Sequence, residues 1–376
     1  MQQYLLPLKS YSGDNFYPHY NNYLIFKSSF SHLISQTSLY ISHPQDHWDL
    51  FKYSPSFAVF MGVFSVLPDG IGLFLWNFLG IGLLTYCLSY IFPSVLRTSI
   101  WGWLLILNDM IASTQNAQSN CLIAGLLLLS WLEVSKNRNA SGALWFCLCG
   151  LIKVYSLAFL PLLFWNSKKP LQLLGYAIGW GILLIALPLI FTDIAGLIFQ
   201  YTEWIRVIKM DADQNLGLSI WSILSLFDLA DIPKLPVVFI GYFICLSPIL
   251  LQKTLKRPEQ IINKISIGTL FIWMIIFNYR AESATYIIAQ CGAAIAIWAL
   301  FPNRKTFIII CVFLFILGWS NSFLFPLDWA HYFTHVIFLK PWGLFVFWIT
   351  IILIQLYSVF YPNSILNISN DYSTRL

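Results

Sequence analysis

Residues 70–91, GIGLFLWNFLGIGLLTYCLSYI, decide the fold, because they run for 22 positions without a charged side chain. A membrane-spanning helix needs about 20 mostly apolar residues in succession. The stretch therefore predicts a helix that crosses a bilayer. Eight further segments reach or nearly reach the same length and composition: residues 98–113, 118–134, 170–191, 234–252, 261–278, 283–299, 305–320 and 341–361.

The composition of the whole chain agrees with these segments. Of its 376 residues, 58% are hydrophobic and 10% are charged, whereas a soluble globular domain carries about 25% charged residues. Because so few charged residues cannot form a water-facing surface, lipid must cover much of the protein surface. We predict an all-α fold, a polytopic transmembrane helical bundle that forms one membrane domain over residues 1–376. The net charge of +5 includes no basic block, which argues against a nucleic-acid partner.

Basic residues in the short connections predict the orientation, because Lys and Arg favour the cytoplasmic side. The best arrangement places residues 1–53 outside, as a first extracytoplasmic loop, and residues 362–376 inside, as a cytoplasmic tail. It puts twelve of the 21 basic residues on short inside segments and most of the acidic residues outside. The twelve are Arg97, Lys136, Arg138, Lys168, Lys169, Lys253, Lys256, Arg257, Lys264, Arg304, Lys305 and Arg375.

Two apolar segments are not expected to cross, because crossings there would move basic residues outside. Residues 54–67 are short and bounded by prolines, which predicts an interfacial or re-entrant helix. Residues 143–165 have basic flanks at both ends, which predicts a hairpin that enters from the cytoplasmic side and returns. Lys153 lies at its middle, and a lysine at membrane depth marks a functional site by default. The alternative is a single helix whose lysine snorkels to the interface.

The predicted orientation requires residues 1–53 to be outside, yet no signal peptide or spanning segment precedes them in this sequence. We therefore expect a further helix upstream of Met1 in the natural protein. The seven cysteines all lie in apolar runs and are interpreted as apolar fillers. No metal-ligand spacing is present, and the scattered histidines predict no metal site.

Three polar clusters on the predicted outer side could carry chemistry. The first loop holds Asp46 and Asp49 in a dense run, DHWDLFKYSP. These carboxylates could be catalytic or substrate-binding, or could cap helices at the interface. The second cluster is Asp109 with residues 113–120, STQNAQSN, which contains more amides and hydroxyls than helix capping needs. The excess favours hydrogen bonds to a polyol or a phosphate, contributed by Asn116, Gln118 and Asn120.

The third cluster, residues 278–283, holds Arg280 and Glu282 between two predicted spans. These two side chains could form a local ion pair, or Arg280 could bind a phosphate. Lys153 is the other candidate phosphate ligand. A polar loop at residues 193–233 predicts an amphipathic surface helix that could cover a site.

The order of several short motifs resembles glycosyltransferase family 87, a group of polytopic GT-C-type enzymes. The motifs are Leu39-Tyr40, Lys52-Tyr53-Ser54-Pro55, Leu67-Pro68, Leu75-Trp76-Asn77, residues 115–120, Ala140-Ser141-Gly142, Leu151-Ile152-Lys153-Val154-Tyr155, residues 215–219 and residues 281–286. The last of these looks like versions common in Bacteroidota. The resemblance covers nearly the whole chain, and the first helix that it implies agrees with the helix expected upstream.

The resemblance implies a GT-C-like bundle in the cell (inner) membrane that transfers a hexose, often mannose, without a cofactor or metal. The donor would be a polyprenyl-phosphate sugar, and the acceptor a glycolipid or a glycan. Such a reaction needs a carboxylate to take the acceptor proton and cations to hold the departing phosphate. Asp49 or Asp109 is the predicted catalytic carboxylate, with Asn116, Gln118, Asn120, Lys153, Arg280 and Glu282 as predicted substrate-binding residues.

The chain departs from the family at one important position. GT-C enzymes usually carry an Asp early in the first loop, and the matching position here falls at Asn21-Asn22. An asparagine cannot act as a general base, so Asp14, Asp49 or Asp109 takes that role, or the chain is an inactive binding protein. A transporter or flippase of lipid-linked sugars is the remaining alternative. A transporter predicts a repeat between the two halves of the chain, which this sequence does not show.

Overall fold

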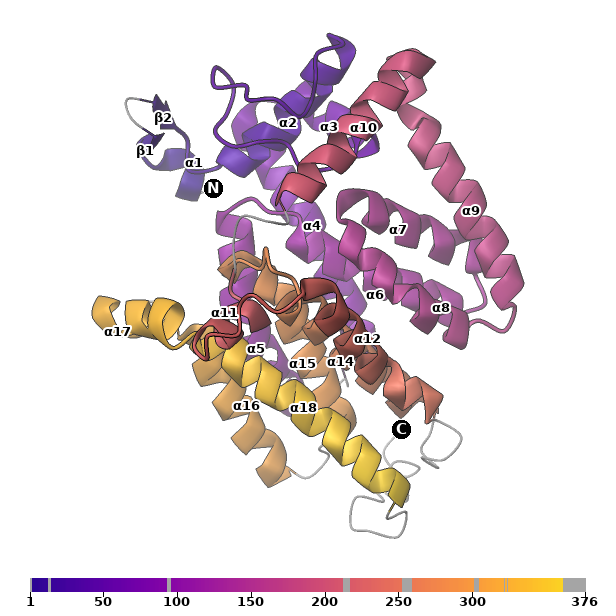
Figure 1. The fold of residues 1–376 in the computed structure, drawn as a ribbon, viewed down its shortest axis with the longest axis vertical. Helices are drawn as coiled ribbons and strands as arrows, with labels where there is room; N and C mark the ends of the chain where they lie inside the picture. The colour runs from indigo at the N-terminus through magenta and orange to yellow at the C-terminus, as the bar shows by residue number, and fades with distance from the viewer. Residues whose placement is uncertain are drawn as a thin grey trace. The chain divides into compact units, whose positions relative to one another are not determined.

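The computed structural model describes residues 2–12, 15–92, 96–211, 217–251, 259–300, 304–320, 322 and 324–360 (Figure 1). These residues are almost entirely helical. Among them, only β1 (Lys9–Ser12) and β2 (Asn15–Tyr17) are strands, and they pair antiparallel. The fold is all-α, which confirms the fold class that the sequence predicts for a polytopic membrane protein.

In the part of the chain that the structure describes, four helical segments are long and apolar enough to cross a membrane: residues 69–91, 170–190, 283–300 and 339–357. They differ in their surroundings. Only 17% of the apolar window in residues 170–190 is buried, and Leu171, Ile182 and Leu183 are among the exposed side chains. Lipid is the environment that accepts such a surface. In residues 283–300, by contrast, 89% of the window is buried, so this helix forms a core.

The chain divides into two compact units. Unit 1 comprises residues 1–88 and 110–214, and unit 2 comprises residues 89–109 and 215–376. Unit 1 contains α1 (Gln2–Leu5), α2 (Asn21–Ile34), α3 (Pro55–Ser65), most of α4 (Asp69–Ile91), α6 (Asn120–Ser135), α7 (Asn139–Ile152), η1 (Val154–Phe159), α8 (Leu160–Asn166), α9 (Pro170–Ala186), η2 (Leu187–Ile190) and α10 (Ile194–Asp211).

The helices of unit 1 begin where the sequence allows. The Ser54 hydroxyl accepts a hydrogen bond from the Phe57 amide, and Pro55 occupies the first helical position, so α3 begins at Pro55. This helix lies in the segment bounded by prolines that was predicted to be interfacial. α3 packs against α2 and α10 (Figure 1). An aromatic cluster fills this junction, with the Phe26 ring 4.8 Å from Tyr53, 5.4 Å from Phe57 and 5.5 Å from Trp76.

Residues 139–169 form a hairpin in unit 1. The helical chain breaks at Lys153, whose φ of −140° and ψ of 117° are extended. The two ends of the hairpin then meet, because Ser167 donates to Asn139 Oδ1 at 3.1 Å and Asn139 Nδ2 donates to the Lys169 carbonyl at 3.3 Å. Lys153 therefore lies at the end of the hairpin away from Asn139. α7 packs between α6 and α9.

Unit 2 is built around α14 (Glu259–Ile276) and α15 (Tyr286–Leu300), which lie side by side along their length (Figure 1). α18 (Leu339–Phe360) packs on both. The remaining elements are most of α5 (Leu96–Gln115), α11 (Ile220–Ser225), α12 (Lys234–Leu250), η3 (Ser283–Thr285), α16 (Arg304–Trp319), α17 (Leu327–His331) and η4 (Tyr332–Val336).

Candidate functional site

The first loop of unit 1 is held in place by a side-chain amide. Asn21 donates from Nδ2 to the Trp48 carbonyl at 2.6 Å and accepts at Oδ1 from the Trp48 amide at 2.8 Å. Only a side chain with both a donor and an acceptor can make this pair of bonds, and an ionised Asp has no donor. The Asn at this position therefore has a structural role: it fixes the backbone that carries the next residue, Asp49.

The surface helix α10 holds the same loop from another direction. Gln200 accepts from the Leu39 amide at 3.1 Å and donates to the Thr37 carbonyl at 2.8 Å. Trp204 donates from Nε1 to the Lys52 carbonyl at 3.2 Å, and the Tyr201 and Ser56 hydroxyls lie 2.7 Å apart. The helix expected to cover a site in this region thus crosses the first loop from residue 37 to residue 56.

Asp49 is the carboxylate that this framework presents to solvent. Its side chain is 51% exposed, and one carboxylate oxygen lies 3.2 Å from Lys52 Nζ. Its backbone has a φ of +74°, a region that L-residues other than Gly, Asn and Asp rarely adopt. Hydrogen bonds from neighbouring residues hold the Asp49 backbone in this strained conformation. Asn21 binds the backbone of Trp48, and His47 Nδ1 donates to the Asp49 carbonyl at 3.0 Å.

The hairpin brings a second lysine to this loop. The Ser54 amide donates to the Leu151 carbonyl at 3.3 Å, which joins the loop to the end of α7. Lys153 Nζ then lies 5.7 Å from the centre of the Tyr53 ring, at cation–π distance. Lys153 is half-buried. Residues 49–54 therefore carry a carboxylate at one end and contact a hairpin lysine at the other.

The polar turn between α5 and α6 is tied to the start of α2. Asn22 donates from Nδ2 to the Asn116 carbonyl at 2.9 Å, and Trp76 donates to the Ala117 carbonyl at 2.9 Å. Asn120 donates to Gln118 Oε1 at 2.6 Å. Of the three predicted amides, Asn116 is exposed, Gln118 is half-buried and Asn120 is fully buried. The Asn116 amide donates to the Ala112 carbonyl at 2.8 Å, which holds this side chain against its own helix.

Adjacent residues at the start of α2 connect these two regions, because Asn21 binds the first loop and Asn22 binds the polar turn. Unit 1 thus links five of the predicted site residues through one framework: Asp49, Asn116, Gln118, Asn120 and Lys153. The other three, Asp109, Arg280 and Glu282, belong to unit 2. Asp14, an alternative carboxylate, lies outside the described residues.

Asp109 in unit 2 is fully buried and forms an ion pair with Lys340, which is 4% exposed. Lys340 Nζ also lies 4.9 Å from the centre of the Tyr286 ring. The Asp109 Oδ2 atom has no hydrogen-bond partner among the described residues. A carboxylate that is buried and already neutralised by an ammonium group is poorly placed to take a proton from a substrate.

The turn at residues 278–283 is a helix start. Glu282 forms a capping box with Thr285, whose hydroxyl donates to the Glu282 carbonyl at 2.7 Å and accepts from the Glu282 amide at 3.2 Å. The Leu218 amide donates to the Ala281 carbonyl at 2.7 Å. Gly217 precedes it with a φ of +54°, and a Cβ there would meet the Tyr279 carbonyl. Arg280 is half-buried beside this contact.

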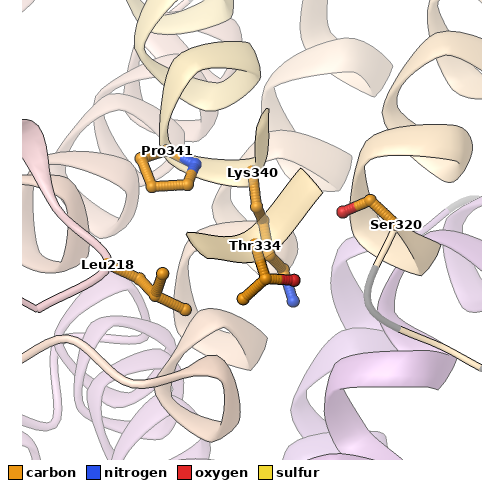
Figure 2. Close-up of a pocket in the computed structure, with 5 residues that line it drawn as sticks. All are labelled: Leu218, Ser320, Thr334, Lys340 and Pro341. Atoms are coloured by element: carbon orange, nitrogen blue, oxygen red, sulfur yellow. The ribbon is translucent and has the colours of Figure 1, made fainter. Parts of the chain in front are cut away.

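A hollow in unit 2 is lined by Leu218, Ser320, Thr334, Lys340 and Pro341, with Leu218 and Ser320 on opposite sides (Figure 2). Its empty volume is about 190 Å³, which includes open solvent.

Several residues of these sites escaped the sequence analysis. Nothing in the sequence pairs Lys340 with Asp109. Lys52 was noted as a member of a polar run and of a family motif, without a role beside Asp49. The first loop also brings His32, His43 and Asp46 together, with donor atoms within 4.8 Å of one another, although the histidines predicted no metal site. The short spacing of His43, Asp46 and His47 was the one available signal.

Burial lowers the pKa of two histidines in this loop, His47 and His32. Burial lowers the pKa of His47 to about 4, with the neighbouring His32 adding to the effect. Burial also lowers the pKa of His32, and the hydrogen bond that His32 donates to the Asp46 carboxylate opposes this effect. Both rings are neutral at pH 7, so they offer lone pairs and no charge.

A search of curated proteins finds no match to this chain. A family model for glycosyltransferase family 87 matches residues 51–301, which is two thirds of the chain. The match begins at the segment that carries Lys52 and Tyr53, and it includes the polar turn, the hairpin and the turn at Arg280. The chain belongs to glycosyltransferase family 87, and it is a membrane glycosyltransferase by that membership.

Proposed function

We propose that this chain transfers a hexose, mannose in the first place, from a polyprenyl-phosphate donor to a glycolipid or a glycan. The reaction takes place at the extracytoplasmic face of the cell (inner) membrane, which the chain crosses many times. The observation that carries the proposal is the arrangement of residues 49–54. They hold an exposed carboxylate at Asp49 and contact a hairpin lysine, Lys153, through Tyr53.

Asp49 is the proposed general base. The acceptor hydroxyl attacks the anomeric carbon of the donor while its proton passes to the Asp49 carboxylate. The bond between the anomeric carbon and the phosphate oxygen breaks, and polyprenyl phosphate leaves with the electron pair. Attack from the face opposite the phosphate inverts the anomeric configuration. We favour Asp49 over Asp109 because Asp109 is fully buried and paired with Lys340.

Lys153 is the proposed ligand of the donor phosphate. A half-buried ammonium group at the end of a hairpin can meet a phosphate at headgroup depth, where low polarity strengthens the interaction. Lys52 is close enough to Asp49 to orient it, at 3.2 Å. Arg280 is a second proposed phosphate ligand. Since the Lys153 ammonium group can neutralise the leaving group, the proposed chemistry needs no metal.

The polar turn is the proposed sugar-binding element. Asn116 and Gln118 present amides that can both donate to and accept from sugar hydroxyls. Asn120 is buried and donates to Gln118, so it orients that amide for the sugar. Glu282 caps η3, the short helix that leads into α15, and shapes the turn that carries Arg280.

The purified protein in liposomes tests this proposal with a panel of radiolabelled polyprenyl-phosphate hexoses. We expect label from one donor to appear in a glycolipid acceptor together with free polyprenyl phosphate. A flippase would instead move the intact donor between leaflets without cleaving it. Donor movement without cleavage, or no transfer from any donor by folded protein, would contradict the proposal.

A further inference from the structure

We propose that His32, His43 and Asp46 bind a divalent transition-metal ion, Zn²⁺ in the first place, with His47 as the fourth ligand. One donor atom from each of the first three residues lies within 4.8 Å of the other two. The His32 and His43 rings are stacked, with centroids 3.6 Å apart. His32 Nε2 lies 2.9 Å from Asp46 Oδ2. Three of the four side chains that would coordinate the ion thus already lie close together in the folded first loop.

The backbone around His43 fixes its ring in a form that can bind a metal. His43 Nε2 donates to the Ser38 carbonyl at 2.9 Å. A neutral imidazole that donates from one nitrogen has a bare lone pair on the other, so Nδ1 is available as a ligand. Metal-bound histidines commonly hold their second nitrogen against a backbone carbonyl in this way.

His47 supplies an independent observation that points to a ligand. Its side chain is 2% exposed, and its Nδ1 donates to the Asp49 carbonyl at 3.0 Å. Its Nε2 is buried and has no hydrogen-bond partner among the described residues. The ring centroid lies 6.0 Å from that of His32 and 5.9 Å from that of His43. A buried lone pair without a partner is costly, and a metal ion would satisfy it.

The donor set selects the kind of metal. Three imidazoles and one carboxylate suit Zn²⁺ and related transition ions, whereas Mg²⁺ and Ca²⁺ prefer oxygen ligands. Zn²⁺ ligands lie about 2.0–2.2 Å from the ion in a tetrahedron, so adjacent donor atoms lie about 3.3 Å apart. The donor atoms of His32, His43 and Asp46 now lie within 4.8 Å of one another, so these side chains and His47 must move closer together to bind the ion. The ion would replace the hydrogen bond from His32 to Asp46, and the His32 ring proton would move to Nδ1.

The position of the cluster indicates a structural role for the ion. His32 lies in the last turn of α2, and the other three ligands lie in the segment that leads to Asp49. A metal ion would join the end of α2 to this segment. The Asn21 amide already joins the start of the same helix to it, through its two hydrogen bonds to the Trp48 backbone. The inference goes beyond the proposed function, because the ion touches neither substrate nor the reacting carboxylate.

Metal titration of the full chain, prepared without a polyhistidine tag, tests the proposal. The detergent-solubilised protein is stripped with a chelator, and Zn²⁺ is added in competition with a chromophoric chelator. We expect one equivalent of tightly bound Zn²⁺ and, on substitution with Co²⁺, the visible absorption of tetrahedral coordination. His32→Gln, His43→Gln and Asp46→Asn should each weaken binding by at least about 100-fold, the upper end of the loss caused by outer-shell changes.

Two variants keep the test decisive. Asp46 is 48% exposed and Asn has the same shape, so Asp46→Asn is expected to fold whether or not an ion binds. His19→Gln removes a half-buried histidine of the same loop from outside the cluster and should bind as the unaltered chain does. The proposal is overturned if the unaltered chain binds no Zn²⁺. It is equally overturned if Asp46→Asn binds Zn²⁺ as tightly as His19→Gln. Neither readout depends on sugar transfer.

Discussion

Lys340 binds Asp109 in a fully buried ion pair, although 231 positions separate the two residues in the sequence. The ammonium group also lies over the Tyr286 ring, whose hydroxyl donates to the Leu218 carbonyl at 2.6 Å. The pair therefore joins α5, α15 and α18 within unit 2. Each of these two charges stabilises the fold only while the other is present, because either charge alone would be buried without compensation.

Removing one member of this pair should destabilise the protein more than removing both. Asp109→Leu or Lys340→Met leaves one buried charge, and breaking a buried pair costs about 3–5 kcal/mol. The double variant replaces both charges with apolar side chains and should recover most of that loss. Thermal unfolding of the four proteins in detergent, followed by size-exclusion chromatography, measures the coupling. Losses in the double variant that equal the sum of the single losses would show that the two residues act independently.

Asn21→Asp introduces the residue type that the resemblance to GT-C enzymes implies near this position, yet we expect it to weaken the first loop. The carboxylate cannot donate to the Trp48 carbonyl, which Asn21 Nδ2 reaches at 2.6 Å. An unsatisfied or repelled partner costs about 1–3 kcal/mol. Limited proteolysis should cut residues 35–54 faster in this variant. Asn22→Asp, which changes the contact with the polar turn, serves as the comparison; equal protection of the unaltered and Asn21→Asp chains would refute the clamp.

Tyr23→Phe should stabilise the protein, most of all in alkali. The Tyr23 hydroxyl is buried without a hydrogen-bond partner among the described residues. Burial, with the Asp69 charge adding to it, raises the pKa of Tyr23 well above its ordinary value of 10.0. The folded state therefore holds this proton more tightly than the unfolded state, so stability falls as the pH rises above 10.0. Unfolding temperatures measured across that range should decline less steeply in Tyr23→Phe; identical slopes would contradict the assignment.

The sequence predicted most of the fold, because apolar length is a local property. The predicted span 70–91 is found as α4 (Asp69–Ile91), which is long and apolar enough to cross a membrane, and the predicted span 118–134 is found as a shorter apolar helix, α6 (Asn120–Ser135). The basic flanks at residues 138 and 168–169 also suggested a hairpin around Lys153. In the structure, Asn139 and Ser167 join its two ends. Such features follow from residues close together in the chain.

The site was less accessible to sequence reasoning, because its contacts are long-range. Nothing in the sequence pairs Asp109 with Lys340, or Gln200 with the backbone of Thr37 and Leu39. The sequence placed the missing base at Asn21-Asn22 but did not reveal that the Asn21 amide makes two hydrogen bonds to the Trp48 backbone. In this protein the side-chain amides of Asn21 and Asn22 form hydrogen bonds with backbone groups of other segments, which the composition of the chain does not reveal.

Lys153→Met should weaken donor use with little effect on folding. Losing a charged hydrogen bond to phosphate costs about 1.5–3 kcal/mol, which corresponds to an increase in the donor KM of about 10–100-fold. Lys153→Arg keeps the charge and should retain part of the affinity. Lys168→Met, at the other end of the hairpin and exposed, is the matched control. If Lys153→Met and Lys168→Met show the same donor KM, Lys153 does not bind the phosphate.

Single-turnover sugar transfer by Asp49→Asn tests the central claim most directly. Asn adopts a positive φ as Asp does, so the strained backbone at φ +74° is preserved while the base is removed. We expect the transfer rate to fall by at least about 100-fold, the lower range for loss of a general base, with donor binding unchanged. The exposed carboxylate of Asp231 provides the control, and Asp231→Asn should transfer at the unaltered rate. Asp49→Asn transferring sugar as fast as Asp231→Asn would contradict the account.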